Sequence, residues 1–137
     1  MIIVSACLAG MKCAWDGKAR SCDKVIQLVK EGKAIPLCPE QLGGLSTPRS
    51  PVEQRDKLVV TKDGTNVSLE FNRGAQEVLK LAKLVDCKKA ILKSKSPSCG
   101  SNLVYDGSFS DKLIKGDGVL AKLLKENGIE VLTEKEI

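Results

Sequence analysis

Apolar residues fall into four short runs along the chain, and each run has the length and composition of a buried β-strand. The runs cover about residues 2–6, 34–38, 89–93 and 129–132. Between the runs, apolar residues spaced three and four positions apart predict amphipathic helices. These helices cover about residues 22–31, 70–85 and 118–126. Strands that alternate with helices predict an α/β fold, with an open, parallel, Rossmann-like sheet flanked by helices.

A second pattern interrupts this alternation between the second predicted strand and the longest helix. Residues 58–61 and 65–68 are short segments that contain β-branched residues, and they flank a Lys-Asp-Gly sequence at 62–64. Asp-Gly is a strong turn signal. The pattern therefore predicts a small β-hairpin insertion over residues 58–68. Residues 103–107 are predicted as a further short strand or hairpin arm.

Length and composition change this picture little. The chain has 137 residues without an internal repeat or a linker, which predicts a single domain over residues 1–137. Aromatic residues make up only 3% of the chain, so the core must be aliphatic. The net charge of +5 indicates a lysine-rich surface, and aromatic residues that could stack on single-stranded nucleic acid are nearly absent.

The redox compartment affects how the six cysteines are interpreted. The apolar opening of the chain is too short for a membrane span and lacks the basic start of a signal peptide. We therefore expect a cytoplasmic protein without membrane contact, whose thiols stay reduced. In that compartment, six cysteines indicate metal ligands or reactive groups rather than a disulfide framework.

Three of the cysteines follow predicted strands: Cys7 the first, Cys38 the second, and Cys99 the third, in a Ser-Pro-Ser-Cys-Gly turn. Because the carboxyl ends of parallel strands meet at one edge of a sheet, these thiols are expected to converge. The chain has no histidine, and its cysteines lack the two-to-four-residue spacing of structural zinc sites. The pattern favours an iron–sulfur centre. Three protein ligands would leave one iron open to act as a Lewis acid.

The remaining cysteines are interpreted differently. Cys22 and Cys87 are expected to be inert packing residues. Cys13 lies in the loop after the first strand and is either a fourth ligand or a nearby thiol. Two alternatives to the cluster stay open at this point: the three convergent cysteines could be small buried hydrophobes, or they could bind zinc.

Two of the cysteine loops carry other reactive groups. Glu40 lies two residues after Cys38, and a carboxylate beside an anionic cluster should have a raised pKa, which suits proton transfer. The alternative for Glu40 is a carboxylate that stabilises a helix start. Ser96 and Ser98 offer two hydroxyls, although both could simply form the turn. A glycine at position 100 allows close backbone approach.

Four separated motifs resemble those of the thiouracil desulfidase (TudS) family. They are Val4-Ser5-Ala6-Cys7-Leu8; Cys38-Pro39-Glu40 with Gly43-Gly44-Leu45 and Pro48-Arg49; Ser96-Pro97-Ser98-Cys99-Gly100; and Tyr105-Asp106-Gly107 with Phe109. The resemblance runs along essentially the whole chain. It implies an α/β domain that holds an oxygen-sensitive [4Fe-4S] cluster through Cys7, Cys38 and Cys99.

The resemblance also implies a reaction: hydrolytic removal of sulfur from a thiolated pyrimidine, whose sulfur binds the open iron. Glu40 would activate the water and Ser96 would be the catalytic serine, while Asp16 and Ser98 would hold the ring. A small-molecule thiopyrimidine is the implied substrate. Two alternatives are a tRNA 4-thiouridine desulfidase and a sulfur-transfer protein, and a zinc-binding module without catalysis is a third. The family pattern has Arg-Tyr before the Asp-Gly where this chain has Ala14 and Trp15.

Overall fold

The computed structural model describes residues 1–137 and has an α/β fold. Its centre is a four-stranded parallel sheet with the strand order β2-β1-β5-β8. The strands are β1 (Ile2–Ser5), β2 (Ala34–Leu37), β5 (Lys89–Leu92) and β8 (Glu130–Thr133). The four apolar runs of the sequence therefore form the parallel sheet that they predict.

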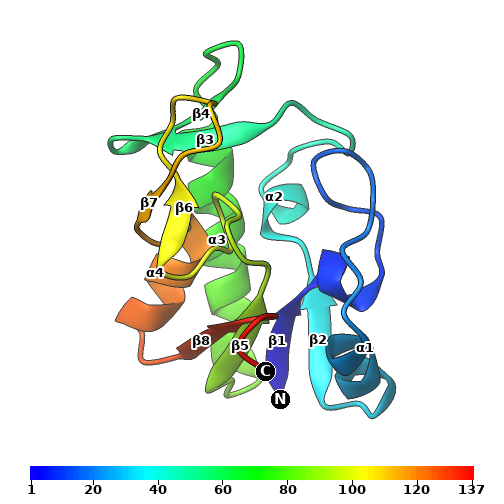
Figure 1. The fold of residues 1–137 in the computed structure, drawn as a ribbon. Coiled ribbons are helices and arrows are strands. Elements are labelled where there is room, and N and C mark those ends of the chain that lie inside the picture. The colour runs from blue at the N-terminus through cyan, green and yellow to red at the C-terminus, as the bar shows by residue number, and fades with distance from the viewer.

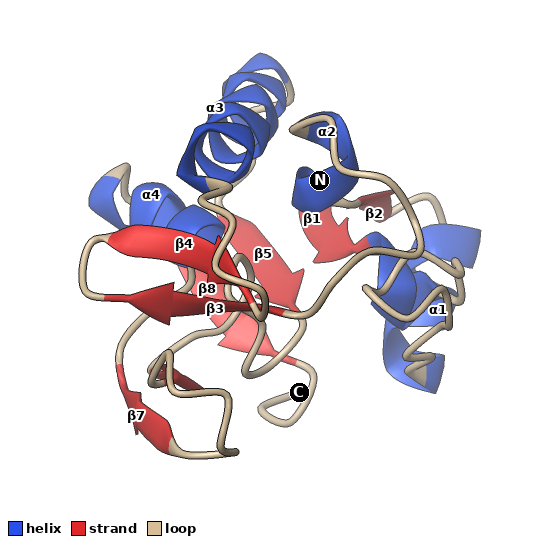
Figure 2. Ribbon diagram, turned by 90° about the horizontal axis from the view of Figure 1, so that it is seen from above, coloured by secondary structure: helices blue, strands red, loops and turns tan.

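Helices cover both faces of this sheet. Successive side chains of a strand point to opposite faces, so apolar neighbours in one strand pack against helices on opposite sides. Ile3 packs into the larger core with α3 (Ser68–Leu84) and α4 (Val119–Glu126), whereas Val4 packs into the smaller core with α1 (Asp23–Lys30). Figure 2 shows α3 and α4 on one side of the parallel strands and α1 on the other. The open, flanked sheet expected from the sequence is confirmed.

The hairpin insertion is present with its predicted pairing, and β4 has a second partner strand that the sequence did not predict. β3 (Val52–Arg55) pairs antiparallel with β4 (Leu58–Thr61). On its other side, β4 pairs with the segment after the turn through the bridge between Val60 and Asn66 and two backbone hydrogen bonds, of 2.9 and 2.8 Å. Asn66 Oδ1 accepts the Ser68 N–H at 2.9 Å, and α3 begins at Ser68, so the second arm ends one residue earlier than predicted. The sequence did not predict β3, because residues 53–55 of this strand are polar.

Two short helices and a second hairpin lie around the carboxyl edge of the sheet. The 3₁₀ helix η1 (Ala6–Ala9) follows β1, and the short helix α2 (Pro39–Leu42) follows β2. β6 (Leu103–Tyr105) pairs antiparallel with β7 (Leu113–Lys115), which confirms the hairpin arm predicted near residue 103. Figure 1 shows the β3–β4 pair lying beyond the N-terminal end of α3. No helix is both long and apolar enough to cross a membrane.

Candidate active site

A cavity of about 490 Å³ lies where β1, β2 and β5 end, a size within the range of small-molecule sites. Cys7, Cys38 and Cys99 all line it, although they are far apart in sequence. Cys7 is in η1, Cys38 is the residue before α2, and Cys99 lies in the turn after β5. The parallel topology brings together the three cysteines singled out in the sequence.

Cys13 is a fourth thiol on the same wall. It is 5% exposed, and the Cys38 Sγ donates to its carbonyl oxygen at 3.9 Å. The two remaining cysteines lie elsewhere. Cys87 packs in the larger core, where its Sγ donates to the Lys89 carbonyl oxygen at 3.0 Å, and Cys22 packs beside α1.

Cys38 and Cys99 have raised pKa values and resist ionisation on their own. Burial raises the pKa of Cys99 to about 12, even though the hydroxyls of Ser5 and Ser96 oppose the change. The hydrogen bond with Cys13 and burial together raise the pKa of Cys38 far above that of a free thiol. Thiols of this kind become thiolates when a cationic metal centre binds them.

The donor set fits an iron–sulfur cluster in its chemistry. Three thiols from separate loops share one cavity in a chain that has no histidine. No three or more Cys, Asp or Glu side chains lie close enough together to hold one metal ion. In a cluster, each thiolate binds a different iron, so ligands can come from separate loops.

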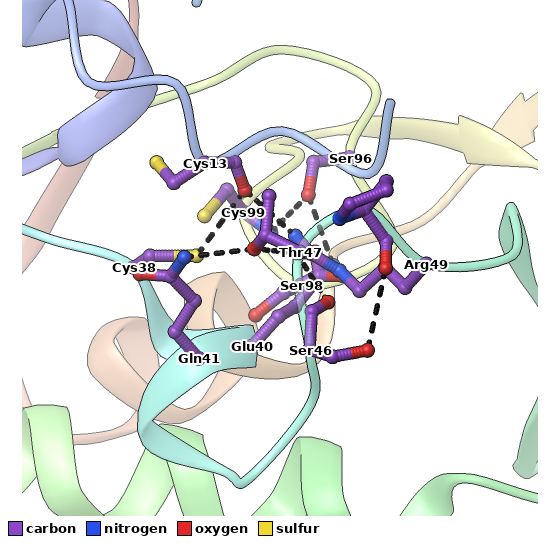
Figure 3. Close-up of polar contacts among 11 residues, drawn as sticks. Cys13, Cys38, Glu40, Gln41, Ser46, Thr47, Arg49, Ser96, Ser98 and Cys99 are labelled. Atoms are coloured by element: carbon purple, nitrogen blue, oxygen red, sulfur yellow. Dashed lines mark hydrogen bonds and ion pairs between the residues drawn. The ribbon is translucent and has the colours of Figure 1, made fainter. Parts of the chain in front are cut away.

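Glu40 and Arg49 form an ion pair in the cavity wall. Glu40 Oε1 lies 3.0 Å from Arg49 Nε, and the side chains are 12% and 7% exposed. Figure 3 shows this pair beside Cys38 and Cys99. Burial raises the pKa of Glu40 although the Arg49 guanidinium opposes the rise. A carboxylate with a raised pKa in a cavity can both take up and release a proton.

The serines of the 96–100 turn occupy different positions. The Ser96 side chain lines the cavity, and its Oγ accepts the N–H groups of Ser98 at 3.2 Å and Cys99 at 3.0 Å. Ser98 is 1% exposed and lies behind the wall, and its Oγ has no protein partner. A Cβ at Gly100 would lie 2.7 Å from the Ser96 carbonyl oxygen, so the turn requires glycine there.

The structure thus separates the two residues expected to hold a ring from the cavity wall. Ser98 is buried and is not among the residues that line the cavity. The Asp16 carboxylate also lies outside the wall, where it pairs with Arg20 at 2.9 Å and has a lowered pKa because of that hydrogen bond. Arg20 and Trp15, on either side of Asp16, do line the cavity.

Arg49 is a residue of the cavity for which the sequence predicted no functional role. Arg49 follows a proline-containing segment without regular structure and lies nine positions after Glu40 in the sequence. Its Pro-Arg motif is part of the family resemblance, but no periodicity connects an irregular loop to a carboxylate. Lys93, Ser94 and Lys95 also line the cavity; Lys93 was predicted only as the end of a strand, and the other two had no predicted role.

Comparisons with known proteins show the family to which the chain belongs. The model of the 2-thiouracil desulfurase family matches residues 2–136, so the chain belongs to that family. The protein YbbK of Bacillus subtilis (strain 168), described as uncharacterized, is 44% identical, with 100% of this chain and 97% of YbbK covered. A solved structure of a [4Fe-4S]-dependent thiouracil desulfidase, TudS, is 41% identical with a TM-score of 0.95, covering 99% of this chain and 91% of that one.

Proposed function

We propose that this protein is a [4Fe-4S]-dependent desulfidase that removes sulfur from thiouracil or a related thiolated pyrimidine by hydrolysis. The observation that carries the proposal is the convergence of three cysteines, Glu40 and Ser96 on one cavity. The similarity to TudS over 99% of the chain supports it. The overall reaction replaces the thiocarbonyl sulfur with an oxygen from water and releases sulfide, without a net transfer of electrons.

Cys7, Cys38 and Cys99 are the proposed ligands of the cluster. With three protein ligands, a bound [4Fe-4S] cluster would supply one open iron as a Lewis acid and a binding site for the substrate sulfur. Cys13, which contacts Cys38, is the fourth thiol of the cavity and has no assigned ligand role.

Glu40 is proposed to move the proton of the attacking water. Its carboxylate lies in the wall of the cavity, next to the residue pair Cys38 and Pro39. Only Oε1 is bound, by Arg49, which leaves Oε2 without a protein partner. Burial favours the neutral acid, so the group can return the proton to a leaving group after accepting it.

Ser96 is proposed to hydrogen-bond the substrate or relay a proton. Its oxygen already accepts two backbone N–H groups, which fixes the position of the side chain. Its hydroxyl proton faces the Cys99 thiol, whose pKa the hydroxyl lowers, and is proposed to turn to the substrate when one is bound. Because Ser98 is buried, we assign the ring contacts to residues at the wall: Ser96 and Trp15, with Asp16 acting through Arg20.

The first prediction tests the whole proposal. After anaerobic reconstitution with iron and sulfide, the protein should consume 2- or 4-thiouracil, measured as loss of thiocarbonyl absorbance. Cys7→Ala, Cys38→Ala and Cys99→Ala should each lose the cluster and the activity. Glu40→Gln should keep the cluster absorbance and lower kcat about 10²-fold or more, because general acid–base catalysis contributes about that factor.

Cys22→Ala is the matched control, since Cys22 packs beside α1 away from the cavity and should not affect either measurement. A stable cluster without turnover of any thiopyrimidine would contradict the desulfidase and support the sulfur-transfer alternative. Full activity without iron, or with any of the three cysteines replaced, would contradict the proposed ligand set.

A further inference from the structure

Arg49 is a buried cation that joins three separate segments of the cavity wall. Nη2 donates to the Cys13 carbonyl oxygen at 3.0 Å, in the loop after β1. Nη1 donates to Thr47 Oγ1 at 2.8 Å and to the Ser46 carbonyl oxygen at 3.2 Å. Nε binds Glu40 Oε1 at 3.0 Å, just after the first residue of α2. Figure 3 shows these contacts converging on one side chain.

The acceptors of Arg49 are themselves fixed. Thr47 Oγ1 also accepts a hydrogen bond from Gln41 Nε2 at 2.8 Å, so the hydroxyl is held from two sides. The Arg49 backbone N–H donates to the Trp15 carbonyl oxygen at 2.8 Å. The main chain and the guanidinium of one residue therefore both bind the loop that follows β1.

The contacts of Arg49 neutralise the Glu40 charge and also fix the direction of the guanidinium. Burying an arginine is costly unless its donors are satisfied, and here Nε and both terminal nitrogens have partners. A planar guanidinium with three nitrogens bound has a fixed direction. Since Arg49 is the only protein partner of the Glu40 carboxylate, that direction decides how the carboxylate faces the cavity.

We propose that Arg49 is the positioning residue for Glu40: it holds Oε1 and leaves Oε2 directed to the cavity at a set distance from the three cysteines. This inference rests on the proposed function, because it assumes that Glu40 acts on the reacting water. Arg49 itself touches neither water nor substrate in this role. It acts through Glu40, and it ties the position of Glu40 to the loop that carries Cys13.

The test compares Arg49→Met and Arg49→Lys with the wild type, as anaerobic cluster-loaded protein turning over 4-thiouracil. Both variants should lower kcat about 10²-fold, because displacing a catalytic group by about 1 Å has that effect. KM should change less than about threefold, and the cluster absorbance per chain should be unchanged. Arg49→Lys should fail to rescue kcat, because an ammonium cannot reproduce the planar fork.

A second measurement does not depend on turnover. Thermal unfolding midpoints are measured for the wild type, Arg49→Met, Glu40→Gln and the double variant. Arg49→Met should lower Tm by about 5 °C more in the wild type than in the Glu40→Gln background. The reason is that only in the wild type does the substitution leave a buried carboxylate without its partner. Effects on Tm that simply add would overturn the inference, as would a loss confined to KM or a kcat within threefold of wild type.

Arg55→Met is the matched control, because the Arg55 guanidinium binds the Gly107 carbonyl oxygen at 2.8 Å and does not line the cavity. It should leave kcat within about twofold; an equal loss of kcat there would overturn the inference. If the Arg49 variants do not fold, Thr47→Val removes one acceptor of the fork and should lower kcat about 3–10-fold at constant KM. An inactive wild type would refute the proposed function, while the Tm cycle would still decide whether Arg49 holds Glu40.

Discussion

The single tryptophan of the chain is left half exposed on the wall of the cavity. Trp15 has 47% of its surface exposed, although a side chain of this size is highly buried in most proteins. Its loop is ordered by the Ala14 N–H, which donates to the Lys18 carbonyl oxygen at 3.1 Å, and by the Arg49 N–H. A large aromatic face held at a cavity suits a planar heterocycle, which can stack on it.

Trp15→Ala should therefore raise KM for a thiopyrimidine about tenfold and change kcat less, because base–aromatic stacking contributes about 1–3 kcal/mol. Trp15→Phe is the control, since it keeps an aromatic face, and it should raise KM by a smaller factor. Steady-state kinetics with 2- and 4-thiouracil measure both. An unchanged KM in Trp15→Ala would show that the indole does not contact the substrate.

At the same scale, the sequence predicted the cysteines better than their neighbours. Cys7, Cys38 and Cys99 could be found because each follows a strand, and topology then places them at one edge. The positions of Ser98 and Arg49 depend on the path of irregular loops, which leaves no periodic signal. Ser98 was expected at the cavity but is buried behind it, and Arg49 had no expected role.

At the scale of elements, α2 owes its position to contact between backbones. A Cβ at Gly74, in the middle of α3, would overlap the Pro39 carbonyl oxygen at the start of α2. A Cβ at Gly43, just after α2, would overlap the Glu70 carbonyl oxygen. The two glycines let α2 lie directly against α3, and α2 carries Glu40.

Gly74→Ala should lower the free energy of unfolding by about 1–3 kcal/mol, as overpacking does. The sign is informative, because alanine is intrinsically about 1 kcal/mol better than glycine inside a helix. Activity should fall as well, since α2 must move away and take Glu40 with it. Urea unfolding and kcat measure the two effects. Gln76→Ala, on the exposed side of α3, should change stability by less than about 0.5 kcal/mol. A stabilised Gly74→Ala protein would contradict this account.

The elements that periodicity in the sequence predicts are those with an apolar face. Buried strands and amphipathic helices were found because one or both faces are apolar, as in β5 and α3. β3 was missed for the opposite reason: only Val52 packs against a core cluster, and the polar side chains of β3 bind loops. Gln54 Nε2 donates to the Pro97 carbonyl oxygen at 2.9 Å, and Glu53 Oε1 accepts the Gly107 N–H at 3.0 Å.

For the whole molecule, the end of the chain closes back onto the loop after β5. Glu134 Oε1 accepts the Ser94 N–H at 2.7 Å, and Oε2 lies 3.0 Å from Lys93 Nζ. Lys93 and Ser94 also line the cavity, so this contact links the C-terminal segment to the candidate active site. The ion pair between Lys93 and Glu134 therefore stabilises the fold and also helps to fix the shape of the cavity.

Burial alone would raise the pKa of Glu134, but the Ser94 N–H and the Lys93 ammonium outweigh it, and the pKa lies below its ordinary value. A lowered pKa in the folded state means that the carboxylate stabilises the fold above its unfolded pKa. That contribution is lost as the pH falls through the folded pKa.

Glu134→Gln should therefore lower the free energy of unfolding by about 1–2 kcal/mol at about pH 7, and the difference from wild type should shrink towards about pH 3.5. Urea unfolding at both pH values measures it, with the exposed Glu126→Gln as control, where little change is expected at either pH. An equal cost of Glu134→Gln at both pH values would mean that shape, and not charge, holds the C-terminal segment to the loop beside the cavity.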